Sequence, residues 1–157
     1  MTNPVYCWSE KGYRPSVVQQ RVREYTYVYS AIDPYSGDVF SLVLPYANTN
    51  CMQIFMDEFA KHVKEEPTLL IMDQASWHKT NSLYTHENII FEYQPPYSPE
   101  LNPVEHFWKY LRKKYMNNNS WESIEDVENA LMEALYSSTK HRDEIRSLSL
   151  FSWMNTL

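Results

Sequence analysis

Residues 94–114, QPPYSPELNPVEHFWKYLRKK, constrain the fold more than any other stretch of the chain. Four of the first ten are prolines, and a helical pattern follows them without a break. Proline fixes φ and has no backbone N–H, so residues 94–103, named here the proline segment, have little conformational freedom. We therefore predict that the proline segment fixes the start of the helix relative to the structure before it.

The helix is predicted to begin at Asn102. Asparagine is a good N-cap, Pro103 suits the first helical position, and Glu105 is then the third residue of the helix. These residues match a capping box, in which the Glu105 carboxylate accepts a hydrogen bond from the Asn102 amide. On this interpretation Glu105 has a purely local role.

The predicted helix has two different faces. Four apolar residues at helical spacing are predicted to face the core: Val104, Phe107, Trp108 and Leu111. Glu105, Lys109 and Arg112 share another face, and Lys113 and Lys114 add to its basic end. This second face is either a solvated set of ion pairs, or an acid at a metal site continued by bases that follow phosphates.

The rest of the chain predicts an α/β fold, with a mixed sheet flanked by helices. Strands are predicted over residues 25–32, 39–44, 68–73 and 88–94, and a fifth is expected at or before the N-terminus. The apolar strand 68–73 is expected to be central and covered on both faces. Helices are predicted within 47–67, within 74–87, from near Asn102, from near Ser123 and over roughly 141–148. Asn50 and Gln53 are expected to cap the first of these helices.

Composition places the chain among folded, single-domain proteins. It has 157 residues, of which 43% are hydrophobic and 22% charged, a balance typical of a globular domain. The net charge of −6 argues against a dedicated nucleic-acid-binding module, although metal ions can offset an acidic site in a nucleic-acid enzyme. Cys7 and Cys51 suggest neither a zinc site nor a disulfide framework. With no signal peptide or membrane span predicted, a reducing, cytoplasmic location is expected.

Asp73 ends the apolar strand, at a position where ligand sites gather in layered α/β folds. It is either a turn residue that caps the following segment, or an acid whose partner is a cation. The next strand leads through the rigid proline segment to Glu105. Two acids held by such a frame can ligate Mg²⁺, which prefers carboxylate oxygens. A pair of such ions can activate water and stabilise the leaving oxygen of a phosphodiester.

Two motifs carry a resemblance to a known family. LIMDQASWHKTNSL, followed by IIFEYQPPYSPELNPVEHFWKYLRKK, resembles the DDE transposases of the IS630/Tc1/mariner superfamily, and the likeness extends upstream through CWSEKGYRP and YTYVYSAIDPYSGDVF. The resemblance implies an RNase H-like (retroviral-integrase-like) catalytic domain over residues 1–157. It implies DNA strand cleavage and transfer that depend on Mg²⁺ or Mn²⁺, with Asp73 and Glu105 as the second and third acids of the metal-binding triad. Transposon ends and target DNA are the implied partners, and a homodimer is the implied assembly.

The first acid of that triad has no counterpart in this sequence. In relatives it lies on the first strand, shortly before the part that matches CWSEKGYRP, and this chain begins only a few residues upstream of that match. The family's helix-turn-helix DNA-binding region is also missing, so a catalytic domain truncated at its N-terminus is expected. Asp33 opens a hairpin turn, Asp38 adjoins the same turn, and Glu10 follows the expected strand, so each is a poor replacement.

Several other side chains are weaker candidates for a role at the site. The candidates for DNA contact are Lys79, Lys109, Arg112 and Lys113. His78 and His106 either lie near the metal or act as capping and surface residues. The tryptophans that either stack on bases or pack locally are Trp8, Trp77 and Trp121. Cys51 is expected to be a buried thiol.

Two functions therefore follow from the sequence. The first is a transposase catalytic domain in which Asp73 and Glu105 hold Mg²⁺ or Mn²⁺ together with an acid absent from this chain. The second is a catalytically inactive transposase remnant that binds DNA or dimerises, which the missing acid and the negative charge favour for the isolated chain. On either hypothesis the isolated chain is expected to be inactive or weakly active.

Overall fold

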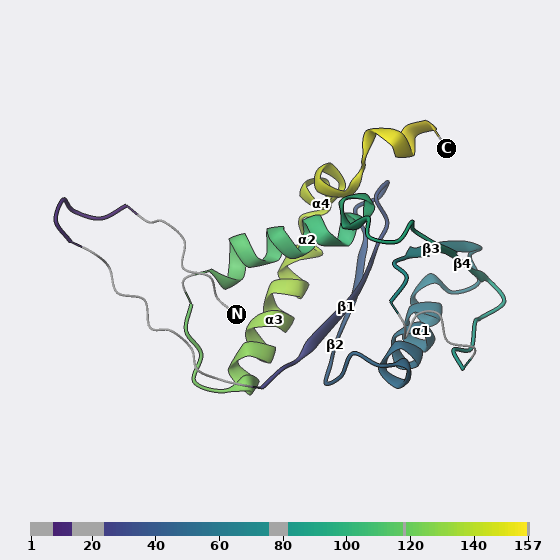
Figure 1. Cartoon of the computed structure of the whole chain (residues 1–157), viewed down its shortest axis with the longest axis horizontal. Helices are drawn as coiled ribbons and strands as arrows, with labels where there is room; N and C mark the ends of the chain where they lie inside the picture. The colour runs from purple at the N-terminus through teal and green to yellow at the C-terminus, as the bar shows by residue number, and fades with distance from the viewer. Residues whose placement is uncertain (1–7, 14–23, 76–81, 118, 157) are drawn as a thin grey trace.

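The computed structural model describes residues 8–13, 24–75, 82–117 and 119–156. Figure 1 shows a hairpin that separates one helix from a group of three others. The strands are β1 (Tyr27–Ile32), β2 (Val39–Leu44), β3 (Thr68–Met72) and β4 (Ile89–Tyr93). The α-helices are α1 (Thr49–Val63), α2 (Pro103–Leu111), α3 (Ile124–Ser138) and α4 (Arg142–Ser149). Shorter turns are η1 (Pro99–Leu101), the π-helical η2 (Arg112–Met116) and η3 (Ser152–Thr156).

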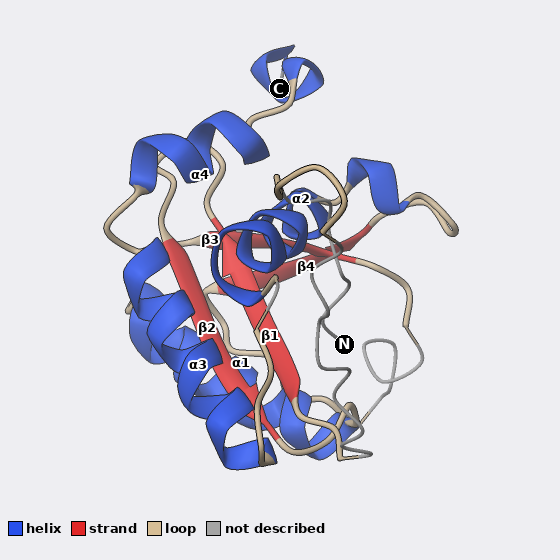
Figure 2. Ribbon diagram, turned by 90° about the vertical axis from the view of Figure 1, so that its left-hand side faces the viewer, coloured by secondary structure: helices blue, strands red, loops and turns tan. Residues whose placement is uncertain are grey.

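The four described strands form two separate pairs, visible in Figure 2. β1 and β2 are antiparallel, with Tyr27 opposite Leu44, and β3 and β4 are parallel, with Thr68 opposite Ile89. The mixed α/β architecture is confirmed, and each predicted strand lies within two residues of its observed bounds. The single sheet that was predicted is not formed by the described residues.

The β1–β2 hairpin is covered on both faces. One face, which includes Tyr29, Ala31 and Phe40, packs with α1 in the first core cluster. The opposite face, which includes Val28 and Val39, packs with α2, α3 and α4 in the second. Since successive strand residues point to opposite faces, this double burial explains why these strands are apolar or aromatic at almost every position.

Helix α1 lies against both strand pairs. Its buried residues are Cys51, Met52, Phe55, Met56 and Phe59, and side chains of β1, β2, β3 and β4 pack against them. The predicted cap at Asn50 is wrong by two residues. Asn48 is the cap, because it is extended, with φ of −150°, and its side chain accepts a hydrogen bond from the Cys51 amide, whereas Asn50 is already inside the helix.

The expected burial of β3 on both faces is wrong for the described structure. Leu69 and Ile71 are 59% and 41% exposed, and only the opposite face of β3 packs against α1. The helix expected within residues 74–87 does not form in the described part, and residues 76–81 lie outside it. Among the described helices, none has the length and apolar character needed to cross a bilayer.

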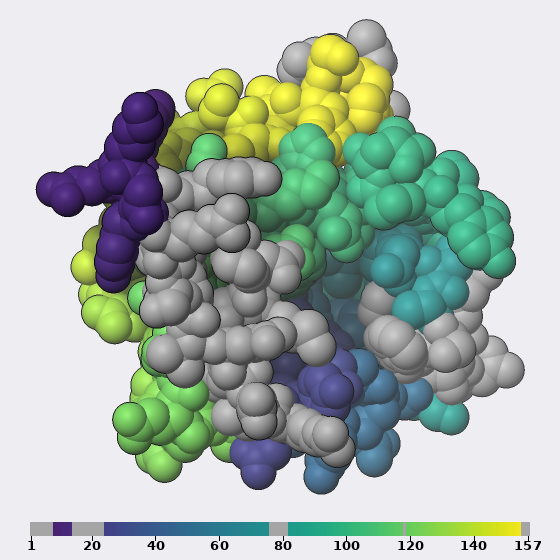
Figure 3. All heavy atoms as spheres, turned by 60° about the vertical axis from the view of Figure 1, so that its left-hand side comes forward, coloured from purple at the N-terminus to yellow at the C-terminus, as the bar shows by residue number. Residues whose placement is uncertain are grey.

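The later helices follow their local signals closely. α3 begins after Ser123, whose side chain and that of Asp126 form a reciprocal capping box, and α4 lies where a helix was predicted. Residues 8–13 project from the rest of the molecule, as Figure 3 shows, and Trp8 is fully exposed.

Gly37 provides a test of the hairpin turn. Its φ is +72°, and a Cβ added there would collide with the backbone carbonyl of Arg142, at the start of α4. We expect Gly37→Ala to lower the free energy of unfolding by about 2–4 kcal/mol, because left-handed strain adds to a backbone clash.

Gly12→Ala is the matched control. Gly12 has φ of +95° with nothing within 4 Å of the added Cβ, so the backbone strain acts without a clash and a smaller loss, of about 1–2 kcal/mol, is expected. Equal losses in urea denaturation would contradict the account of the turn.

Candidate functional site

Asp73 follows the last residue of β3 and is exposed. Its Oδ1 accepts a hydrogen bond from the Ala75 amide, with 3.0 Å between oxygen and nitrogen. This Asx-type turn matches the local interpretation of Asp73. It also holds the carboxylate in one orientation at the end of the strand, so the turn is compatible with a role as a ligand.

Glu105 lies in the first turn of α2 and is half-buried. The predicted capping box is wrong, although Asn102 is the cap. The Asn102 side chain accepts from the Val104 amide at 3.1 Å, and the Asn102 amide donates to the Pro99 carbonyl at 3.0 Å. Because the Asn102 amide already has this partner, the Glu105 carboxylate is not needed there. Within the described residues, that carboxylate makes no hydrogen bond or ion pair.

Gln94 connects the end of β4 with the start of α2. Its side chain and backbone are only 8% exposed, and its backbone N–H donates to the Met72 carbonyl at the end of β3, at 2.9 Å. Its side-chain nitrogen donates to the Leu101 carbonyl at 3.3 Å, one residue before the cap of α2. The proline segment therefore starts from a buried anchor that ties β3, β4 and the entry to α2 together. We did not single out Gln94 from the sequence, where its only signal was a polar residue between a predicted strand and two prolines.

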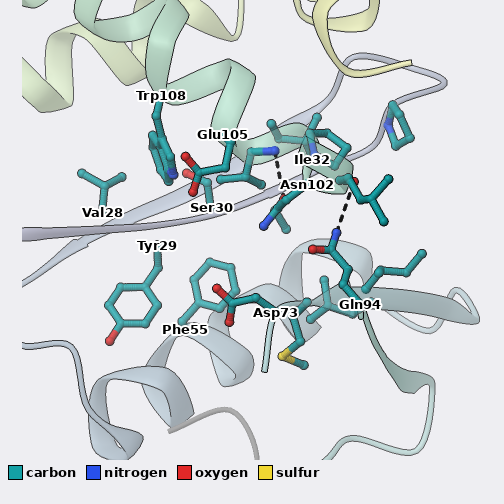
Figure 4. A pocket seen from close by; sticks show the side chains of 18 of the residues that line it. Val28, Tyr29, Ser30, Ile32, Phe55, Asp73, Gln94, Asn102, Glu105 and Trp108 are labelled. Atoms are coloured by element: carbon teal, nitrogen blue, oxygen red, sulfur yellow. Dashed lines mark hydrogen bonds between the residues drawn. The ribbon is translucent and has the colours of Figure 1, made fainter. Parts of the chain in front are cut away.

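Two adjoining cavities meet at this anchor. The larger, of about 420 Å³, is named here the inter-strand cavity, and the smaller, of about 390 Å³, the loop cavity. Asp73, Gln94, Asn102 and Glu105 line both of them. In Figure 4 the carboxylates of Asp73 and Glu105 project from opposite sides into the space between their elements. The structure thus brings the two acids predicted from the sequence to one cavity system.

The inter-strand cavity lies between two unpaired strand edges. Every residue of β1 and residues Leu69, Leu70, Ile71 and Met72 of β3 line it, whereas no described residue of β2 or β4 does. Each strand pair has β1 or β3 as one edge. The apolar side chains of Leu69 and Ile71, left exposed on β3, belong to this lining.

The donor set of the site consists of oxygen atoms from carboxylates and amides. Such hard donors suit Mg²⁺ or Mn²⁺ rather than zinc or copper, so the residues present fit the implied ion. Among the described residues, no group of three or more His, Cys, Asp and Glu side chains converges. Among the described residues, Asp73 and Glu105 are the acids that line these two cavities.

The acids considered as replacements have structural roles. Both carboxylate oxygens of Asp33 accept hydrogen bonds within its turn, from the Tyr35 amide and the Ser36 hydroxyl. Asp38 pairs with Arg142 at 2.7 Å and with His62 at 2.9 Å. Glu10 is exposed in the projecting N-terminal stretch and lines neither cavity among the residues described. Neither Asp33 nor Asp38 lines the inter-strand cavity or the loop cavity.

The basic residues at the end of α2 and in η2 differ in their contacts. Lys109, Arg112 and Lys113 are exposed and line neither cavity. The ammonium of Lys114, in contrast, bonds to the Glu144 carboxylate and the Tyr110 hydroxyl, each at 2.8 Å. Burial raises the pKa of Tyr110 to about 12, and the hydrogen bond from Lys114 lowers the pKa of Glu144. Lys114 thereby fastens η2 to α4.

The remaining candidates that the structure describes do not gather at the acids. His106 Nδ1 donates to the Leu148 carbonyl at 3.1 Å and its ring packs edge-on against Phe151, so this histidine holds the end of α4. Cys51 is buried in α1, as predicted, and Trp121 is half-buried. Trp77, His78 and Lys79 lie outside the described residues.

A family model described as DDE superfamily endonuclease matches residues 1–128 of the chain. The chain belongs to this family. Protein y4pE/y4sA of Sinorhizobium fredii (strain NBRC 101917 / NGR234) is 34% identical over 130 residues, covering 82% of this chain and 96% of that protein. The DDE assignment made from the two motifs is therefore confirmed.

The fold has a counterpart among solved structures. The Mos1 transposase, in a paired-end complex with the left transposon end, matches with a TM-score of 0.59 and 14% sequence identity. The match covers 96% of this chain and 52% of that one, so the DDE chain spans about half the length of the transposase. This likeness confirms the predicted RNase H-like fold.

Gln94→Met tests whether the buried anchor stabilises the junction between β3, β4 and α2. Methionine has similar length but no hydrogen bond donor, so the Leu101 carbonyl loses its partner. We expect the free energy of unfolding to fall by about 1–3 kcal/mol, the cost of leaving a buried polar group unpaired. Asn119→Ala removes an exposed bond of the same kind, to the Tyr115 carbonyl, and is expected to cost less than about 0.5 kcal/mol. Thermal and urea denaturation would measure both, and a Gln94→Met change as small as the control's would refute the role of the anchor.

Proposed function

We propose that this domain is a transposase catalytic domain for metal-dependent DNA strand cleavage and strand transfer, and that Asp73 and Glu105 are two of its metal ligands. The observation that carries the proposal is that these acids, one directly after β3 and one in α2, line the same two cavities. Membership in the DDE endonuclease family supports the reaction class, and such endonucleases generally depend on divalent metals.

The residues present define what this chain contributes to the reaction. Asp73 and Glu105 would hold Mg²⁺ or Mn²⁺ between the end of β3 and the first turn of α2. When bound, the ion supplies charge neutralisation at the phosphodiester and lowers the pKa of the attacking water. The Asx-type turn at Asp73 and the anchor at Gln94 orient the two carboxylates before substrate arrives, which is the usual requirement for catalytic precision.

A third ligand is proposed to come from a further strand that fills the inter-strand cavity. The cavity is lined by the unpaired edges of β1 and β3, and the backbone groups of a strand are the partners that two such edges lack. Its lining includes the exposed apolar side chains of Leu69 and Ile71. A strand ending near Asp73 would place its last side chain beside both acids.

DNA is the proposed substrate and partner. The Mos1 structure contains a transposon end, which supports a nucleic-acid substrate for this fold relative. Lys109, Arg112 and Lys113 are exposed on α2 and η2, beyond the helix turn that carries Glu105, so they are proposed to contact phosphates. Lys79 is proposed for the same role on sequence grounds. A homodimer remains a proposal from the resemblance.

A second candidate function is a catalytically inactive domain that binds DNA or dimerises. The observation that favours it is the absence of a third converging acid among the described residues. The net charge of −6 points the same way for the isolated chain.

Charge-neutralising variants test the metal ligands. We expect Asp73→Asn and Glu105→Gln each to weaken Mn²⁺ binding at least tenfold, because each removes a charged ligand while keeping side-chain size. Glu100→Gln, an exposed acid in η1, is the matched control and should bind Mn²⁺ like the unaltered chain. Isothermal titration calorimetry gives the affinities. Unchanged binding in either test variant would remove that residue from the site.

Nicking of supercoiled plasmid in Mn²⁺ decides between the two functions. Nicking by the unaltered chain that is lost in both test variants supports the enzyme, and DNA binding without any nicking supports the inactive domain.

Amide hydrogen exchange tests the open strand edges. In the chain alone, alternate amides of β1 and β3 should exchange rapidly, because one edge of each strand lacks a neighbour. The intervening amides, paired with β2 or β4, should be protected. Protection at every residue of β1 and β3 would mean that the edges are already paired and that no further strand is needed.

A further inference from the structure

Tyr97, in the middle of the proline segment, has an unusual backbone conformation. Its φ is +60°, and among the described residues only Lys64 is another non-glycine with positive φ. Lys64 ends α1, where such a conformation is common. Tyr97 does not end a helix, and a bulky aromatic residue is disfavoured at positive φ. Strain of this kind tends to be kept where the site requires it.

The side chain of Tyr97 gains nothing from the rest of the protein to offset that strain. It is 101% exposed, and within the described residues it has no hydrogen bond and no ring contact. Tyr110, in contrast, has the partners Glu144 and Lys114 for its hydroxyl. Pro96 and Pro99 restrict the chain on either side of the ring. The loop therefore presents a flat, solvent-facing ring on a stiff backbone.

The position of this ring relates it to the two acids. Tyr97 lines the loop cavity together with Asp73 and Glu105, so a molecule held by those acids would have the ring at its side. The cavity volume of about 390 Å³ falls in the range of small-ligand sites and suits one nucleotide. A phosphodiester at the acids has a base attached on each side, one sugar away.

We propose that Tyr97 is a stacking platform for an unpaired nucleobase next to the phosphodiester held at Asp73 and Glu105. The inference rests on the proposed DNA-cleavage function and adds a subsite to it. An exposed aromatic face accepts any base, so the subsite favours single-stranded or frayed DNA over a closed duplex. The preset backbone lowers the ordering cost of the contact, which is the physical reason for keeping a strained tyrosine there.

Two variants distinguish the contribution of the Tyr97 ring from that of its backbone conformation and hydroxyl. Tyr97→Asn removes the ring but keeps a residue that tolerates positive φ, so its folding should be as stable as that of the unaltered chain or more stable. Tyr97→Phe keeps the ring and removes only the hydroxyl. Tyr25→Asn is the matched control, since Tyr25 is 71% exposed and lines neither cavity.

The probe is a single-stranded 12-nucleotide DNA carrying one 2-aminopurine, compared with its duplex, in Mn²⁺. Fluorescence anisotropy should show Tyr97→Asn binding the single strand about 5- to 150-fold more weakly, the range for one lost base stack. Tyr97→Phe and Tyr25→Asn should stay within about twofold of the unaltered chain. Quenching of 2-aminopurine should be lost in Tyr97→Asn, and duplex binding should change less than single-strand binding.

The outcomes distinguish failure of the subsite from failure of the function. If Tyr97→Asn binds the single strand like the unaltered chain, the subsite is overturned, while metal binding at Asp73 and Glu105 still stands. If Tyr97→Phe loses as much affinity as Tyr97→Asn, a hydrogen bond from the hydroxyl replaces stacking and the proposal is wrong. If the unaltered chain binds neither DNA, the proposed function and the subsite fail together.

Discussion

The buried residue Gln94 makes the contacts that link the elements carrying Asp73 and Glu105. Its backbone amide donates to the end of β3, and its side-chain nitrogen donates to the last residue before the Asn102 cap. The prolines that follow remove most of the freedom that would let α2 shift against the sheet. Asp73 and Glu105 lie on opposite sides of this connection, so their relative position is set by one buried polar residue and a stiff loop.

The surrounding helices pack around this connection, but the two strand pairs stay separate. Helix α1 packs beneath both strand pairs, and α2, α3 and α4 cover the opposite face of the hairpin. β3 has no such cover on its second face, and its unpaired edge meets that of β1 across the inter-strand cavity. The acids therefore stand at the rim of the inter-strand cavity, where the proposed further strand and a substrate would have access to the same place.

Local sequence signals predicted the elements well, because capping and periodicity act within a few residues. The Ser123 cap, the strand 39–44 and the start of α2 at Asn102 all follow from such signals. Contacts between residues distant in sequence could not be predicted from these local signals. The bond of Lys114 to Glu144 and the uncovered face of β3 both depend on how distant segments meet in space. Asp73 and Glu105 were found through motifs, whereas Gln94 and Tyr97 needed the structure.

We propose that Asp73 and Glu105 share one metal ion, and anomalous diffraction from crystals soaked in Mn²⁺ can locate that ion. One strong peak is expected between the two carboxylates, with an oxygen of each at about 2.1 Å, a distance typical of small octahedral ions. A peak bound by only one of these acids, or ions found only elsewhere on the surface, would contradict it.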